Sequence, residues 1–252
     1  MNLKHYLDQK AKLYNKPSFI PFDPISIPSQ FSRKEDIEIS AFFTALISWG
    51  RRDQIIKSAN LLMSVMECSP FEFVMGAGEQ EIKRLESFYY RTFNGDDLIF
   101  LLYALRKLYQ KDGGLENIAT KSFYESGNIK KVITSIRSSL LKTPHLKRSE
   151  KHLANPDEGS AAKRINMFLR WMIRHDRSGV DFGIWKSIPK SALMCPLDVH
   201  SGRVARHLGI LSRKQNDWKA VQELTEALRL FDKEDPVKYD FALFGIGVFE
   251  KL

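Results

Sequence analysis

Residues 155–166 read Asn-Pro-Asp-Glu-Gly-Ser-Ala-Ala-Lys-Arg-Ile-Asn, and residues 196–206 read Pro-Leu-Asp-Val-His-Ser-Gly-Arg-Val-Ala-Arg. Each stretch places turn-forming residues before a run with helical spacing, and so predicts the start of a helix. A helix start leaves backbone N–H groups without intrahelical partners and carries the positive end of the helix dipole. Both stretches therefore predict positions that stabilise an anion such as a phosphate or a carboxylate.

Each predicted helix start carries one reactive side chain, Lys163 in the first and Asp198 in the second. A lysine amine can attack a sugar carbon once it is deprotonated, which burial or a neighbouring cation such as Arg164 promotes. Asp198 suits a different role, because a carboxylate can stabilise the positive charge that develops when a base leaves its sugar, or relay protons. The alternatives are an ordinary solvated helix lysine and a carboxylate that only caps its helix.

The rest of the chain predicts further helices and almost no strands. Apolar residues recur at helical spacing in residues 36–50, which indicates a core helix ended by Gly50. The Pro-rich stretch 17–28 is expected to run extended over the surface as a tether. Further helices are expected at about 53–67, 70–76, 79–87, 95–111, 115–124, 128–141, 160–174, 198–208, 216–231 and 236–248.

These elements predict an all-α fold of two lobes. We expect a middle helical barrel formed by residues 36–160, and a second lobe formed by residues 1–35 together with residues 161–252. The active cleft is expected between the two lobes. Trp185 is the aromatic residue that we expect to stack on a base held in that cleft.

The charge of the chain favours an anionic partner. Its 252 residues carry a formal net charge of +9, with a sequence pI of about 9.4. Between Lys130 and Arg177, twelve Lys and Arg outnumber four Asp and Glu. We interpret this basic run as a surface for DNA phosphates, with Lys147, Arg148 and Lys151 as contacts, and a solvated helical face as the alternative.

Several classes of protein do not fit the sequence. Cys68 and Cys195 are too few for a disulfide framework or an iron–sulfur cluster, and we expect no cofactor. His175, Asp176 and Asp181 are spaced as in a capped turn, so no metal is expected either. The N-terminus does not read as a signal peptide, and no apolar run is long enough to span a membrane. We expect a cytoplasmic monomer.

The two motifs resemble those of the helix-hairpin-helix DNA glycosylase superfamily, which includes endonuclease III and the 8-oxoguanine glycosylases. Gly159 and Lys163 match a degenerate form of its Leu-Pro-Gly-Val-Gly-x-Lys-Thr-Ala hairpin, and residues 197–204 match its downstream Val-Asp-x-His-x-x-Arg-Val. The resemblance extends over about residues 36 to 250, and the wide Lys163 to Asp198 spacing is similar to that of the archaeal 8-oxoguanine branch. As a whole, the chain is similar to an uncharacterised bacterial family allied to this superfamily.

The resemblance implies a two-lobed glycosylase-like fold and an activity on double-stranded DNA. Lys163 would be the Schiff-base nucleophile and Asp198 the catalytic carboxylate of a base-removing enzyme, with 8-oxoguanine as the first candidate base. A β-lyase step would follow.

The implied DNA contacts are the backbone around Gly159 and Ser160, which would bind a phosphate, together with Arg164 and His200. Two alternatives remain open, a DNA-binding module of the same fold without catalysis and an all-α protein that binds folded RNA.

Overall fold

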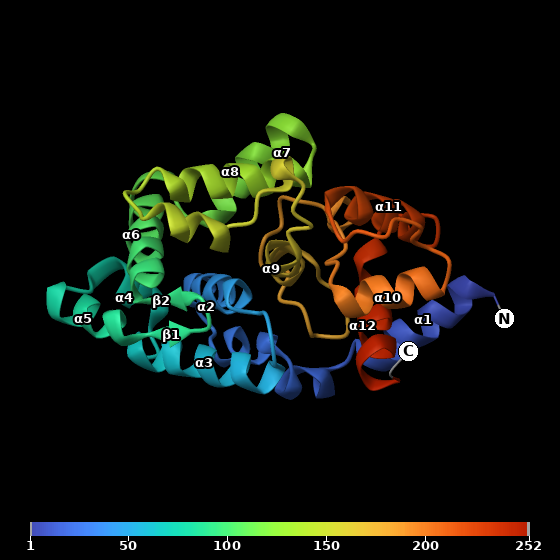
Figure 1. The fold of residues 1–252 in the computed structure, drawn as a ribbon, viewed down its shortest axis with the longest axis horizontal. Coiled ribbons are helices and arrows are strands. Elements are labelled where there is room, and N and C mark those ends of the chain that lie inside the picture. The colour runs from blue at the N-terminus through green and yellow to red at the C-terminus, as the bar shows by residue number, and fades with distance from the viewer. Residues whose placement is uncertain (1, 251–252) are drawn as a thin grey trace. The chain divides into compact units, whose positions relative to one another are not determined.

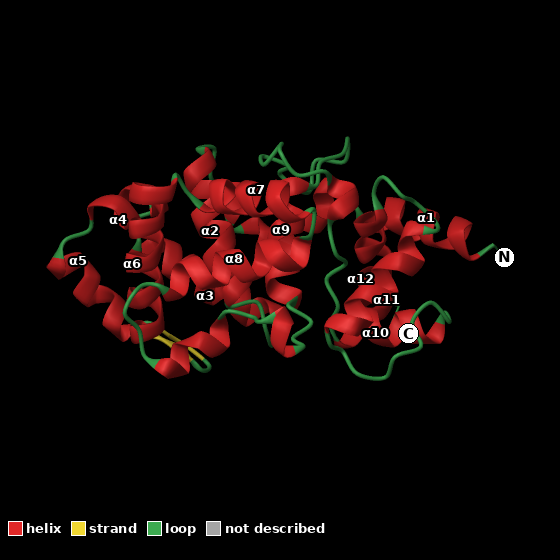
Figure 2. Ribbon diagram, turned by 90° about the horizontal axis from the view of Figure 1, so that it is seen from above, coloured by secondary structure: helices red, strands yellow, loops and turns green. Residues whose placement is uncertain are grey.

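The computed structural model describes residues 2–250, which are predominantly helical. The α-helices are α1 (Leu3–Tyr14), α2 (Lys34–Leu46), α3 (Arg52–Val65), α4 (Pro70–Gly76), α5 (Glu79–Arg84), α6 (Gly95–Asp112), α7 (Leu115–Ser126), α8 (Ile129–Leu141), α9 (Lys163–Ile173), α10 (Val199–His207), α11 (Trp218–Arg229) and α12 (Tyr239–Phe249). Two short strands, β1 (Tyr89–Tyr90) and β2 (Phe93–Asn94), pair as an antiparallel hairpin (Figure 2). The prediction of an all-α fold is confirmed.

Short 3₁₀ helices connect many of these elements. They are η1 (Pro17–Phe22), η2 (Pro24–Ser26), η3 (Pro28–Gln30), η4 (Leu85–Ser87), η5 (Lys147–His152), η6 (Pro156–Glu158), η7 (Lys190–Ala192) and η8 (Pro236–Lys238). Among residues 2–250, no helix has both the length and the apolar character needed to cross a membrane.

The Pro-rich stretch differs from the extended tether that we expected, because it folds into η1, η2 and η3. Proline fixes φ near −65°, which suits a 3₁₀ helix, and Pro24 and Pro28 each occupy a first helical position. The Asp23 side chain caps η2 by accepting from the backbone N–H of Ile25 at 3.1 Å. Ile25 and Ile27 are completely buried, so this stretch belongs to a core.

The chain divides into two compact units, Pro21–Ala154 on the one hand and Met1–Ile20 with Asn155–Leu252 on the other. We call them the central unit and the terminal unit. Their boundaries lie after residues 20 and 154, where the sequence suggested divisions after residues 35 and 160.

In the central unit, α2 is the innermost helix, because every residue from Ile37 to Leu46 is buried. This confirms the core helix predicted from apolar spacing, although it ends at the cap residue Ile47 rather than at Gly50. One carboxylate lies inside this core. Glu38 accepts hydrogen bonds from the Tyr109 hydroxyl and from the backbone N–H of Leu115, which satisfy the buried charge.

In the terminal unit, the first and last helices of the chain lie side by side, α1 in blue and α12 in red in Figure 1. A Cβ atom added at Gly245 of α12 would lie 2.0 Å from the ring of Tyr14 in α1, so the two helices approach too closely for any side chain there. On α12, Gly247 in turn lies against His200 and Val204 of α10. Helix α12 therefore connects the N-terminal helix to the helix that begins beside Asp198.

Candidate active site

Helix α9 begins at Lys163, which is therefore its first residue and not a residue one turn into a helix from 160, as the sequence suggested. The preceding residues cannot continue the helix backwards, since Gly159 and Ala162 both have left-handed backbone conformations, with φ of 89° and 50°. Ala162 offers no side-chain cap to the α9 amides. The positive end of the α9 dipole thus lies next to the Lys163 side chain and favours an anion there.

Asp198 is the N-cap of α10 and forms a capping box with Ser201. Its Oδ1 accepts hydrogen bonds from the backbone N–H groups of His200 and Ser201 at 2.9 and 3.0 Å. The Ser201 hydroxyl donates to the same oxygen at 3.2 Å, and its Oγ lies 2.9 Å from the Asp198 backbone nitrogen. These contacts fix the orientation of the carboxylate. All of those that reach the carboxylate involve the same oxygen, Oδ1.

The other oxygen of Asp198, Oδ2, lies 4.0 Å from the Nζ atom of Lys163. The two side chains are 29% and 25% exposed, so both are partly accessible within the terminal unit. Lys163 Nζ also lies 3.6 Å from the Met167 sulfur, one turn further along α9. The amine of Lys163 and a fixed carboxylate thus face each other at the starts of two helices.

A comparison with family models adds one match. A model described as "Protein of unknown function (DUF2400)" matches residues 23–249. The chain belongs to the DUF2400 family. No curated protein and no solved structure matches it significantly. The matched range includes Lys163, Asp198 and all of α9 to α11, while the family description assigns them no activity.

A second carboxylate of this DUF2400 chain belongs to the same region, and sequence reasoning missed it. Asp240, the second residue of α12, is buried and forms an ion pair with Arg170 of α9. Burial raises the pKa of Asp240 to about 6; the charge of Arg170 opposes the rise, the charge of Asp198 adds to it, and that of Lys163 opposes it. The signal was available in the sequence, because Asp240 is the only charged residue in the apolar stretch of α12.

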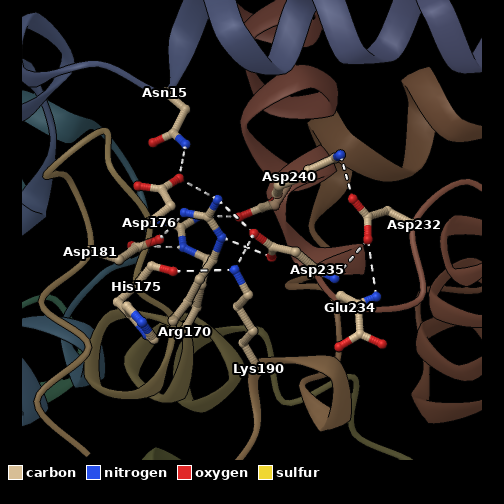
Figure 3. Close-up of polar contacts among 12 residues, drawn as sticks. Asn15, Arg170, His175, Asp176, Asp181, Lys190, Asp232, Glu234, Asp235 and Asp240 are labelled. Carbon is tan, nitrogen blue, oxygen red and sulfur yellow. Dashed lines mark hydrogen bonds and ion pairs between the residues drawn. The ribbon is translucent and has the colours of Figure 1, made fainter.

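Figure 3 shows further ion pairs around Arg170, all within the terminal unit. Asp181 accepts from Arg170 at 3.2 Å and from Arg174 at 2.8 Å, and Asp235 accepts two further bonds from Arg174 at 3.0 Å. Both arginines are buried; burial by itself lowers the pKa of Arg174, but the carboxylates of Asp181 and Asp235 outweigh it and raise that pKa. These two members of the basic run are therefore structural, which corrects their assignment to a DNA-facing surface.

The turn after α9 is capped as its spacing suggested. Asp176 Oδ1 accepts from the backbone N–H of Ser178 at 2.8 Å, while Oδ2 accepts from Asn15 and Arg174, both at 2.6 Å. Within residues 2–250, no group of three or more His, Cys, Asp or Glu side chains is arranged to hold a metal ion.

The backbone around Gly159 and Ser160 is engaged in its own turn, contrary to the phosphate-binding role implied for it. The N–H of Gly159 donates to Pro156 at 3.1 Å, and that of Ser160 donates to Asn155 at 3.1 Å. The carbonyl of Gly159 accepts from Trp218 at 3.0 Å. Neither amide is available to a phosphate unless this turn opens, although the exposed hydroxyl of Ser160 is.

Two other implied DNA contacts, Arg164 and His200, lie close to Lys163 and Asp198 in the sequence. Arg164 is half-buried, and desolvation lowers its pKa to about 10, which leaves it a cation at neutral pH. His200 is exposed, and its backbone N–H is part of the α10 cap. The imidazole of His200 is therefore the more accessible of the two groups.

Lys147, Arg148 and Lys151 lie in the central unit, and they differ in what they contact. Arg148 donates to Asp97 at 3.0 Å, Asn94 at 2.9 Å and the carbonyl of Thr92 at 2.9 Å, so its guanidinium is tied to the protein. Lys147 is 89% exposed and makes a surface ion pair, and Lys151 is exposed. The two lysines are thus better placed than Arg148 to contact phosphates.

Trp185 is a core residue, which corrects the stacking role that we expected for it. Its side chain is 1% exposed and meets Phe168 of α9 edge to face, with ring centroids 5.4 Å apart. A base cannot stack on the Trp185 ring, because other protein atoms already cover almost all of it.

Proposed function

We propose that this protein is a DNA glycosylase with an associated β-lyase step. The observation that carries the proposal is the pairing of Lys163 Nζ with Asp198 Oδ2 at 4.0 Å, at the starts of α9 and α10. An amine nucleophile and a fixed carboxylate are the two groups that base removal through a Schiff base requires. The basic character of the chain supports a polyanionic substrate.

In the proposed reaction, a damaged nucleotide is flipped out of the duplex and its sugar is brought to Lys163. The deprotonated amine of Lys163 donates its lone pair to form a bond to the sugar C1′ while the glycosidic bond breaks, and the base departs with the electron pair of the glycosidic bond. Asp198 stabilises the positive charge that develops on the sugar, and the capping hydrogen bonds to Oδ1 hold it ready for that role. The C1′–O4′ bond then opens as an amine proton moves to the ring oxygen, which gives the Schiff base; loss of a C2′ proton from it expels the 3′ phosphate by β-elimination and cuts the strand.

The substrate class is part of the same proposal. Because the sequence resembles the oxidised-guanine branch of the glycosylases, a duplex with 8-oxoguanine is the first substrate to test and duplexes with oxidised pyrimidines are the second.

The test is borohydride trapping on this panel of duplexes, because borohydride reduces a lysine Schiff base to a permanent cross-link. Wild-type protein should form a cross-linked product, and Lys163→Gln should form none. The matched control is Lys219→Gln, which replaces an exposed lysine in the first turn of α11 and should trap like wild type. Duplex binding without trapping on any lesion would replace the enzyme with a DNA-binding module, and preferential binding of folded RNA would favour the RNA-associated alternative.

A further inference from the structure

Asp240 is a buried carboxylate that the proposed reaction has not used. It is 7% exposed, and an ion pair joins it to Arg170 across the contact of α12 with α9. Burying a charged group costs free energy unless partners compensate, and Arg170 supplies that compensation for Asp240. A carboxylate is thus kept within the otherwise apolar stretch of α12.

The geometry of α9 relates Asp240 to the catalytic pair. Lys163 and Arg170 are seven residues apart, which places both on one face of α9, and Arg174 follows as the C-cap of the helix. Arg170 contacts both Asp181 and Asp240 from this face. The same stripe of α9 thus presents the proposed nucleophile at its start and the partner of Asp240 two turns further on.

Asp240 also experiences the charges of both catalytic residues. The groups that act on it are Lys163 and Arg170 from α9, Asp181 from the loop after α9, and Asp198 at the start of α10. Asp240 in turn acts on the buried thiol of Cys195, whose pKa it helps to raise. Because electrostatic interactions between ionisable groups are mutual, a charge on Asp240 is also felt by Lys163 and Asp198.

We infer that Asp240 is a third ionisable member of the Lys163–Asp198 site, and that it acts on the reaction through the charge it presents to these two residues. The inference rests on the proposed function and adds a positioning residue to it. A negative charge here stabilises the cationic sugar of the base-release step.

Base release and Schiff-base formation should therefore respond differently to Asp240→Asn. Base release from a lesion duplex should slow on the order of tenfold, since one negative charge is lost near the developing cation. Trapping on a duplex that already contains an abasic aldehyde needs no base release, so at neutral pH its rate should be unchanged. A variant that was merely less well folded would slow both steps together, and that result would overturn the inference.

Asp181→Asn is the matched control, because Asp181 is equally buried, contacts both arginines and lies in the same network. It should change the two rates by the same factor. Wild-type base release should also rise as the pH increases through about 6, the pKa to which burial raises Asp240. Asp240→Asn should lack this rise, whereas Asp181→Asn should retain it with the midpoint moved to lower pH, because the Asp181 charge no longer helps to raise the pKa of Asp240.

A titration without DNA separates this inference from the proposed function. The Asp240 carboxyl carbon is followed by NMR against pH in wild type, Lys163→Met and Asp198→Asn. Removing the lysine charge should shift the midpoint of Asp240 upward, and removing the Asp198 charge should shift it downward. Asp217→Asn, which alters the cap of α11, should leave it unchanged.

Midpoints that stay constant in both active-site variants would overturn the inference even if the protein traps DNA. Midpoints that move as expected, in a protein that traps no lesion, would support the coupling and reject the glycosylase.

Discussion

Asp198 uses its two carboxylate oxygens differently, since Oδ1 caps α10 and Oδ2 lies 4.0 Å from Lys163 Nζ. One residue thus combines a structural role with the proposed catalytic one. The cap fixes the carboxylate relative to the helix, and the helix is held in turn by α12, whose Gly247 carbonyl accepts from Arg203 at 3.1 Å.

Two substitutions at Asp198 should separate these roles. Asp198→Asn retains an oxygen that can accept from the α10 amides, and asparagine is as good an N-cap as aspartate, so stability should change little. Base release should nevertheless slow by orders of magnitude, because the negative charge that stabilises the developing cation is gone. Asp198→Ala should lose both the cap of α10 and the negative charge, so base release should slow and stability should fall by about 1 kcal/mol. Single-turnover base release and urea unfolding measure the two effects, and an Asn variant with wild-type rates would exclude Asp198 from catalysis.

Asp240 should make the stability of the fold depend on pH. Its pKa is raised by burial from 3.8 to about 6, so the folded protein binds a proton that the unfolded chain has released across this window. The stabilisation is complete below pH 3.8 and is lost as the pH rises through 6, by about 3 kcal/mol in total. The difference in unfolding free energy between wild type and Asp240→Asn should therefore fall between pH 4 and pH 7. A difference that stays constant over this range would show that Asp240 does not titrate there.

The contact of α1 with α12 should not tolerate a methyl group at Gly245. Gly245→Ala would place a Cβ atom 2.0 Å from the ring of Tyr14, so the helices must separate or the ring must move, at a cost of about 1–3 kcal/mol. The control is Gly76→Ala at the end of α4, where no atom lies within 4 Å of the new methyl group. The melting temperature should fall for the first variant and not for the second. Equal melting temperatures would mean that this packing is absent in solution.

The basic residues of the central unit should divide into two kinds. Replacing Lys147 and Lys151 with alanine should reduce the salt dependence of duplex binding by up to roughly 2 in log–log slope, with little effect on stability. Arg148→Ala should mainly lower stability, by about 1–3 kcal/mol, because it removes a donor from the buried carboxylate of Asp97. An unchanged slope after both lysines are replaced would place the DNA contacts elsewhere.

Much of the fold could be predicted from the sequence because helical spacing and turn residues are local signals. The core helix α2 follows from its apolar spacing, and α10 follows from the cap formed by Asp198. The sequence predicts too early a start for α9, because a left-handed backbone at Ala162 has no signature in an Ala-Ala-Lys string. The Pro-rich stretch predicts an extended segment, although the same fixed φ suits a 3₁₀ helix.

The site could be predicted only where it depends on residues near each other in the chain. Lys163 and Asp198 were identified from two local motifs, whereas their approach to 4.0 Å depends on how α9 and α10 pack. The role of Arg170 and Arg174 was missed because their carboxylate partners, Asp181, Asp235 and Asp240, come from distant segments. Burial is likewise not visible in the sequence, which is why Trp185 was expected to stack and Asp240 was overlooked.

The most direct test of the central claim is to locate the cross-link that borohydride forms between the wild-type protein and a duplex containing 8-oxoguanine. After digestion, mass spectrometry should find the sugar adduct on the peptide that contains Lys163, and Lys163→Gln should form no adduct while binding the duplex with nearly unchanged affinity. An adduct on another lysine, or a Lys163→Gln variant that cross-links as well as wild type, would contradict the assignment of Lys163 as the nucleophile.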